Sequence, residues 1–152
     1  MGVTQKSEIL TNRLKRNRSK SRSLALQTLF EIDLTKHHVD DVLGHLMVES
    51  DLDKNHLDFT RKIVHGVIDK QKQIDSLIAQ CATERGVGDL PSLDRNVLRM
   101  GILELIDFPN TPPKVVVNEA IELARIYGSD NSYKFVNGVL GTVLKKLKIE
   151  NV

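Results

Sequence analysis

The residues of this chain that are best suited to a chemical task are ones that could hold RNA. Lys134 and Phe135 place a cation directly beside a large aromatic ring. An aromatic ring can stack on an unpaired base while a neighbouring cation neutralises its phosphate. At about 100° per residue, Asn131 and Lys134 lie away from the apolar stripe of their predicted helix, with Phe135 at its border. The alternative is that Phe135 only covers the edge of the core, since isolated apolar surface residues are common.

The basic N-terminal segment is a second candidate for RNA binding. Residues 1–22 contain seven cations and one carboxylate, whereas the remaining residues contain fifteen cations and nineteen carboxylates. A basic segment on a mildly acidic body is typical of nucleic-acid binding, because each neutralised phosphate releases counterions. Arg18, Lys20 and Arg22 lead directly into the first predicted helix, where Arg18 and Arg22 would share a face one turn apart. The alternative is a solvated, disordered tail that aids solubility.

The sequence contains no pattern of a catalytic or metal site. Its five histidines have no HExxH spacing, and its only cysteine, Cys81, continues an apolar helical stripe. The pair Gly86 and Gly88 has no preceding strand and no following lysine and serine, so it is not a phosphate loop. GxSxG and SxxK motifs are also missing. We therefore predict that the chain is not an enzyme and uses no cofactor or metal. A single cysteine and the absence of an apolar N-terminal run predict a cytoplasmic protein.

Hydrophobic spacing predicts an all-α fold of about seven helices. The stripe of Ala25, Leu26 and Leu29 predicts a helix from about Ser19 to Leu34, and later stripes predict helices to the end of the chain. Residues 1–17 show little periodicity, so we expect a flexible basic arm followed by one helical domain over residues 18–150. No stretch approaches the roughly 18 apolar residues of a membrane span.

Two predicted helix ends bear on the candidate sites. Gly128 follows the helix that precedes Lys134 and Phe135, and we expect it to adopt the left-handed conformation that often ends a helix. Asp94 falls in the first turn of the helix predicted from about Ser92 to Asp107, where the helix dipole stabilises a carboxylate. Gly101 lies inside that same helix and indicates close packing against a neighbour.

The C-terminal strings NEAIELA (118–124) and KFVNGVL (134–140) closely resemble the NusB family of bacterial transcription antitermination factors. The resemblance extends to residues 25–30 and 97–105 and covers about residues 18–145. It implies two packed helical bundles and an RNA-binding surface that includes the entry to the first helix, here Arg18 to Arg22. The match at that entry is partial, because Lys20 stands where arginine is usual. In the family, an acidic residue at the position of Asp94 contacts NusE, a small-subunit ribosomal protein.

The resemblance also implies a function and partners. With NusE, the chain would bind the single-stranded boxA element of nascent RNA, notably on ribosomal RNA operons. It would act within an elongation complex that contains RNA polymerase and other Nus factors. Asn131 departs from the family, whose members often carry an acid there. If that edge faces RNA, the loss of a negative charge should help binding or leave it unchanged.

Other classes of function also fit an all-α basic protein. The same fold heads certain ribosomal RNA cytosine methyltransferases, so the chain could be a non-catalytic module related to them. The end of the chain at Val152, which leaves no room for a methyl-donor domain, favours the antitermination reading. A protein–protein adaptor and a helix-turn-helix DNA binder are weaker alternatives. A DNA-reading helix would be rich in Arg, Asn and Gln, and the last helix has few of them.

Overall fold

The computed structural model describes residues 2–82 and 84–149, and every regular element in those residues is helical. In chain order the elements are α1 (Val3–Thr35), α2 (Val39–Glu49), α3 (Lys54–Asp69), α4 (Gln71–Cys81), the short 3-10 helix η1 (Val87–Asp89), α5 (Ser92–Asp107), α6 (Pro113–Tyr127) and α7 (Ser132–Lys146). This confirms the predicted all-α fold with seven α-helices. No helix in the described part of the chain is long and apolar enough to cross a membrane.

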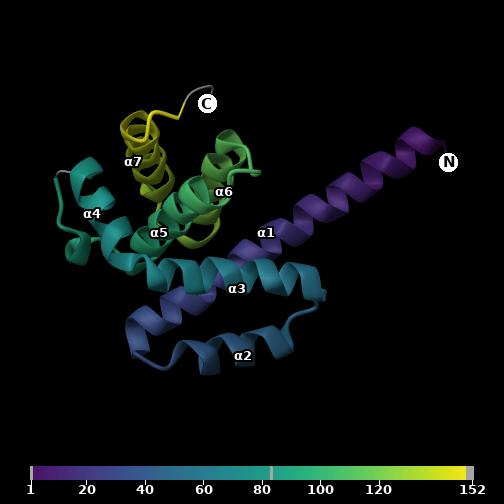
Figure 1. Ribbon diagram of the computed structural model, residues 1–152, viewed down its shortest axis with the longest axis horizontal. Coiled ribbons are helices and arrows are strands. Elements are labelled where there is room, and N and C mark those ends of the chain that lie inside the picture. Colours follow the sequence, from purple (N-terminus) through teal and green to yellow (C-terminus); the bar gives the residue numbers. More distant parts are fainter. Residues whose placement is uncertain (1, 83, 150–152) are drawn as a thin grey trace.

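The helices form two bundles that meet along α5. One bundle contains α1, α2 and α3, and the other contains α4, α5, α6 and α7 (Figure 1). Helix α5 also packs against α1 and α3, so it belongs to the contact surface of both bundles. This arrangement confirms the two packed helical bundles that the family resemblance implied.

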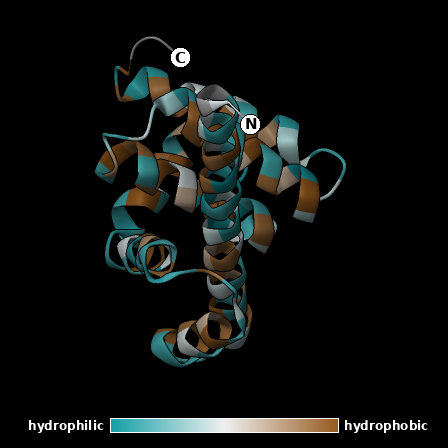
Figure 2. Cartoon of the chain, turned by 90° about the vertical axis from the view of Figure 1, so that its right-hand side faces the viewer, coloured by the Kyte–Doolittle hydropathy of each residue, from teal (hydrophilic) through white to brown (hydrophobic). Residues whose placement is uncertain are grey.

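The core follows from the amphipathic pattern of these helices. Figure 2 shows hydrophobic and hydrophilic residues alternating along the same helices, as expected when one face packs inward. Helix α5 is the exception, because all of residues 96–104 are buried. A Cβ atom added to Gly101 would lie 3.3 Å from Leu140 of α7 and 3.7 Å from Ala120 of α6. The predicted close packing at Gly101 is therefore confirmed.

Helix α1 begins much earlier than the sequence pattern predicted. It starts at Val3, so residues 3–17 are helical and not the irregular arm that we expected. The physical reason is local: residues 3–35 contain no glycine or proline and include six leucines, four arginines and three lysines, which favour helix without a packing partner. Once nucleated by the packed half of α1, the helix extends at little further cost. The boundary at residue 17 and the flexibility of this extension remain predictions.

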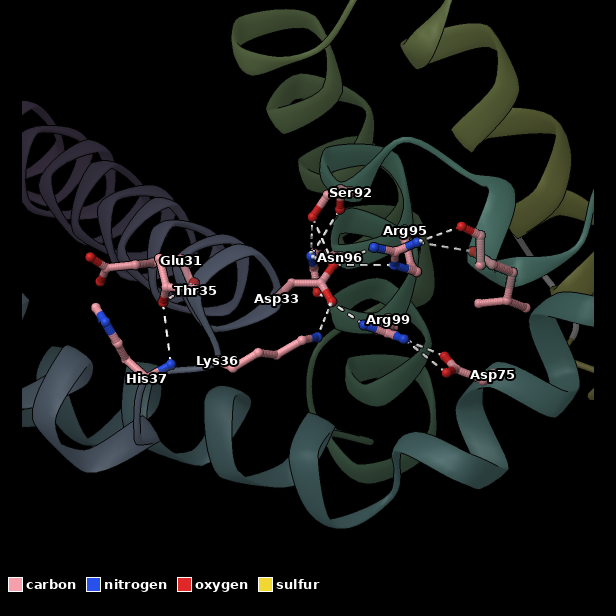
Figure 3. Close-up of polar contacts among 12 residues, drawn as sticks. Glu31, Asp33, Thr35, Lys36, His37, Asp75, Ser92, Arg95, Asn96 and Arg99 are labelled. Atoms are coloured by element: carbon pink, nitrogen blue, oxygen red, sulfur yellow. Dashed lines mark hydrogen bonds and ion pairs between the residues drawn. The ribbon is translucent and has the colours of Figure 1, made fainter.

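A polar network joins the end of α1 to the start of α5 (Figure 3). Asp33 accepts hydrogen bonds from the Ser92 hydroxyl at 2.7 Å, from the Arg95 guanidinium and from the Asn96 amide at 3.3 Å. Arg95 also donates to the backbone oxygens of Val87 and Leu90, at 3.2 Å each. The network therefore fixes η1 and the first turn of α5, which borders the site described below.

We expect the contribution of Asp33 to stability to depend on pH. Burial alone would raise the pKa of Asp33, but hydrogen bonds from Arg95 and Ser92 and the nearby arginine charges lower that pKa overall. A pKa that is lower in the folded state than in the unfolded state stabilises the protein at pH values above the unfolded pKa of about 3.9. This stabilisation is lost as the pH falls through the folded-state pKa. In urea unfolding at pH 7, Asp33→Asn should lower the free energy of unfolding by about 1–3 kcal/mol. The difference from the wild type should shrink at pH 3, and a constant difference would contradict this account.

Candidate nucleic-acid interface

Three of the predicted RNA-binding residues line one open pocket. Asn131, Lys134 and Phe135 contribute to a cavity of about 690 Å³ at the start of α7. The segment after α4 contributes Glu84 and Arg85 to its wall, and the start of α5 contributes Asp94. The structure therefore brings together side chains from three separate parts of the sequence. The pocket combines an aromatic ring, two cations and two carboxylates.

The turn between α6 and α7 determines where this pocket lies. Gly128 has φ −91° and ψ −172°, which is extended backbone, so the predicted left-handed conformation is wrong. The glycine is needed for a different reason, because an added Cβ would lie 2.6 Å from the Ala124 carbonyl oxygen and 2.6 Å from the Ser132 hydroxyl. The Ser132 hydroxyl accepts a 3.0 Å hydrogen bond from the Ser129 backbone N–H. The tight turn starts α7 with Lys134 and Phe135 at the pocket.

Phe135 and Lys134 have different surroundings within the pocket. Phe135 is half-buried and packs against the hydrophobic core, while part of the ring lines the pocket. It therefore covers the core edge, as the alternative interpretation held, and also presents a surface on which a base could stack. Lys134 is exposed, with its Nζ 5.8 Å from the ring centroid of Tyr133. Lys134 lines the same pocket, and its role as a phosphate contact remains a prediction.

Asp94 is buried, although the prediction made it a contact for a partner protein. It is only 6% exposed, and its Oδ1 atom is buried without a hydrogen-bond partner among the described residues. As predicted, Asp94 lies in the first turn of α5, where the helix dipole favours a negative charge. A partner that contacts this carboxylate has to place a donor inside the pocket. Its role as a partner contact remains a prediction.

The basic segment of α1 sends its side chains in different directions. The Arg18 guanidinium lies 3.9 Å from the ring centroid of Phe59, with one side of the exposed residue still accessible. Burial lowers the pKa of Arg18, as does the charge of Arg22, while the charge of Glu104 opposes them. Lys20 is exposed and pairs with the exposed Asp51 at 3.3 Å. Arg18 and Lys20 are therefore both available for RNA, but on different sides of α1.

Arg22 is not available for RNA, which contradicts its prediction as an RNA contact. It is 3% exposed and its guanidinium forms a double hydrogen bond with the Glu104 carboxylate, at 2.9 Å and 2.8 Å. The predicted shared face with Arg18 is nevertheless present, because the Arg22 guanidinium lies 5.3 Å from the centroid of the same Phe59 ring. Arg22 is buried because this face of α1 packs against α5. Arg22 therefore ties α1 to α5.

The two groups of candidate residues lie far apart. Arg18 borders the end of α5 near Asp107 and Phe108, whereas the pocket with Lys134 borders the start of α5 at Asp94. These ends of α5 are separated by about 20 Å, given a rise of about 1.5 Å per residue. A nucleic acid that contacts both groups must therefore extend over several nucleotides. Sequence reasoning did not identify Arg85, because nothing in its local sequence separates it from other surface arginines.

Comparison with known sequences gives one consistent result. The model of the NusB family matches residues 19–145. The chain is 40% identical to the transcription antitermination protein NusB of Chloroflexus aggregans over 140 residues, which is 91% of this chain and 93% of the relative. It is 42% identical to the NusB protein of Roseiflexus castenholzii over 133 residues, covering 86% of this chain and 94% of the relative.

Comparison with solved structures agrees with the sequence result. The fold is similar to that of T. maritima NusB, with a TM-score of 0.80, 31% identity and coverage of 85% of this chain and 91% of the other. It is also similar to a chain in a structure of the antitermination factors NusB and NusE in complex with double-stranded RNA. That match has a TM-score of 0.79 and 27% identity, and it covers 86% of this chain and 98% of the other.

Proposed function

The chain belongs to the NusB family of transcription antitermination factors, and we propose that it binds the boxA element of nascent RNA together with NusE. Within the transcription elongation complex of RNA polymerase and other Nus factors, it would oppose termination, notably on ribosomal RNA operons. This is a binding function carried out in the cytoplasm, and no catalytic step is part of it. The observation that carries the proposal is the pocket that combines Phe135, Lys134 and Asn131.

The proposed RNA contacts divide into two kinds. Lys134, Arg18 and Lys20 would contact phosphates, which supplies affinity that depends on salt but carries little sequence information. Phe135 would stack on an unpaired base, which requires that the RNA is single-stranded at this point. The exposed side chain of Asn131 at the pocket edge would accommodate the RNA without adding negative charge. Arg22 would act indirectly by holding α1 in place.

The proposed contact with NusE involves Asp94. A structure of relatives contains NusB, NusE and double-stranded RNA together, which supports a joint role for the two proteins. Because the Asp94 carboxylate is buried at the pocket, we propose that a basic or amide side chain of NusE enters the pocket to reach it. Such a donor would satisfy the Oδ1 atom that has no partner within the described chain.

The proposed function can be tested by fluorescence anisotropy with labelled RNA. Single-stranded boxA RNA, a scrambled RNA of equal length and an RNA duplex are titrated with the chain, with and without NusE, at several salt concentrations. We expect a preference for single-stranded boxA, tighter binding with NusE and a steep loss of affinity with salt. Equal and weak binding to all three RNAs would show that the chain has kept the fold without the function.

A substitution at Asn131 tests whether this edge of the pocket faces RNA. Asn131→Asp adds one negative charge at an exposed position, so RNA affinity should fall by about 1 kcal/mol, or roughly fivefold, through repulsion of phosphate. The loss should become smaller as salt rises, because exposed charges are screened. Anisotropy titrations of the two proteins at low and high salt measure both effects. Unchanged affinity at low salt would place the RNA elsewhere.

A further inference from the structure

The N-terminal extension of α1 exposes three large apolar side chains. Residues 3–17 continue α1 as a helix that projects away from both bundles (Figure 1). Ile9 is 49% exposed, Leu10 is 58% exposed and Leu14 is 57% exposed. Leu10 and Leu14 are four residues apart, so they lie on the same face one turn from each other. The extension is thus a largely polar helix that exposes a pair of leucines on one face.

A shallow apolar groove lies at a different place, between α2 and α3. It has a volume of about 450 Å³ and is lined by the apolar side chains of Leu43, Met47, Val48 and Leu57 and by the charged side chains of Asp40 and Arg61. Val48 is 86% exposed. Gly44 lies in the middle of the groove, where a Cβ atom would meet nothing within 4 Å. Glycine weakens a helix interior, and packing within the monomer does not require it here. Its effect is to leave the groove open to the close approach of another helix.

The two surfaces have opposite charge. Residues 37–65, which include every residue that lines the groove, contain six carboxylates, two lysines and one arginine, whereas residues 2–17 contain four cations and one carboxylate. Asp40 lines the groove and is 3.3 Å from His65, whereas Asp58 lies outside its lining and is 2.7 Å from Arg61. The Asp40 and Asp58 side chains are nevertheless 66% and 42% exposed, so they remain open to further cations. A basic helix that exposes a pair of leucines therefore complements this groove, which is apolar and lies in a segment with more carboxylates than cations.

We propose that the N-terminal extension of one copy docks in the α2–α3 groove of a second copy, forming a reciprocal dimer. The extension cannot reach the groove of its own chain, because it continues α1 as one helix that points away from α2 (Figure 1). Pairing of two extensions with each other is disfavoured because both are positively charged. In a two-fold dimer each copy gives one extension and receives one, so both unpartnered surfaces are covered at once. The inference is independent of the proposed RNA function.

The test is the molar mass of the full chain in solution, measured by sedimentation velocity over a range of concentrations and at two salt concentrations. We expect a dimer whose dissociation constant rises with salt, because opposite charges meet in the contact. Leu10→Gln combined with Leu14→Gln keeps the charge and helix propensity of the extension but should weaken the dimer about tenfold or more. Gly44→Leu should weaken it similarly by filling the groove, while helix propensity keeps the variant folded.

The decisive experiment mixes Gly44→Leu with the Leu10→Gln, Leu14→Gln double variant and measures their association. The extension of Gly44→Leu and the groove of the doubly substituted chain are both intact, so the mixture should associate more tightly than either variant alone. Leu34→Gln, at an exposed position outside both surfaces, is the control and should dimerise like the wild type. A wild type that is monomeric at every concentration would overturn the proposal. So would a dimer that resists Gly44→Leu, which would indicate paired extensions, or one weakened equally by Leu34→Gln.

Discussion

Replacing Glu104 with alanine is expected to destabilise the protein by about 3–5 kcal/mol, more than any other single change considered for this chain. Arg22 and Glu104 are 3% and 2% exposed, and their double hydrogen bond is buried between α1 and α5. Removing the carboxylate would leave a buried guanidinium whose nearest remaining acid, Glu119, is 4.0 Å away. Urea unfolding followed by circular dichroism measures the loss.

A matched control separates the buried pair from the general effect of removing a carboxylate near Arg22. Glu119 also approaches Arg22, but its side chain is 24% exposed and it accepts a hydrogen bond from Ser19 at 3.0 Å. Glu119→Gln should therefore cost about 1 kcal/mol. If Glu104→Ala and Glu119→Gln lowered stability by the same small amount, the buried pair would not be what joins the two bundles.

The helical core could be predicted well because its signal is local and periodic. The stripes of α5 and α7, such as Val97, Leu98, Val139 and Leu140, are fully or almost fully buried, as their spacing indicated. The start of α1 could not be predicted in the same way. Residues 5–16 are exposed wherever their side chains are described, so this part of α1 leaves no apolar period that spacing analysis could detect. Helix propensity decides its conformation.

The candidate site could be predicted only in part. Asn131, Lys134 and Phe135 are neighbours on α7, so a single helical segment was enough to bring them together. The burial of Arg22 depends on Glu104, which is 82 residues away in the sequence. Charge alone therefore grouped Arg22 with Arg18 and Lys20, although only the latter two are exposed. The depth of Asp94 likewise depends on the approach of α7, which spacing in one helix cannot indicate.

Helix α5 explains how one structural element can serve both candidate RNA surfaces. Its start forms part of the pocket through Asp94, and its end borders the stack of Arg18 on Phe59. Phe108, just after α5, meets the Phe59 ring edge-on at a centroid distance of 5.5 Å. Because α5 is buried against both bundles, the distance between the two surfaces is fixed by the core. An RNA that uses both surfaces would meet a rigid spacing.

Phe135→Leu is expected to lower the affinity for single-stranded boxA RNA by about 5- to 150-fold, the range of about 1–3 kcal/mol per stacked base. Leucine keeps an apolar side chain at the core edge, so the free energy of unfolding should change by less than about 1.5 kcal/mol. Phe135→Tyr retains the ring and should retain most of the affinity. Anisotropy titrations and urea unfolding of the same preparations measure the two quantities.

The outcome for Lys134→Ala decides how the Phe135 result is interpreted. Loss of one phosphate contact should lower the slope of log affinity against log salt by about 0.7, whereas loss of stacking should leave that slope unchanged. If Phe135→Leu bound boxA as tightly as the wild type while Lys134→Ala bound more weakly, the pocket would contact only the phosphates. Phe135 would then serve only to cover the core. If Phe135→Leu alone weakened binding at an unchanged salt slope, the half-buried ring would hold a base and would explain why the RNA must be single-stranded there.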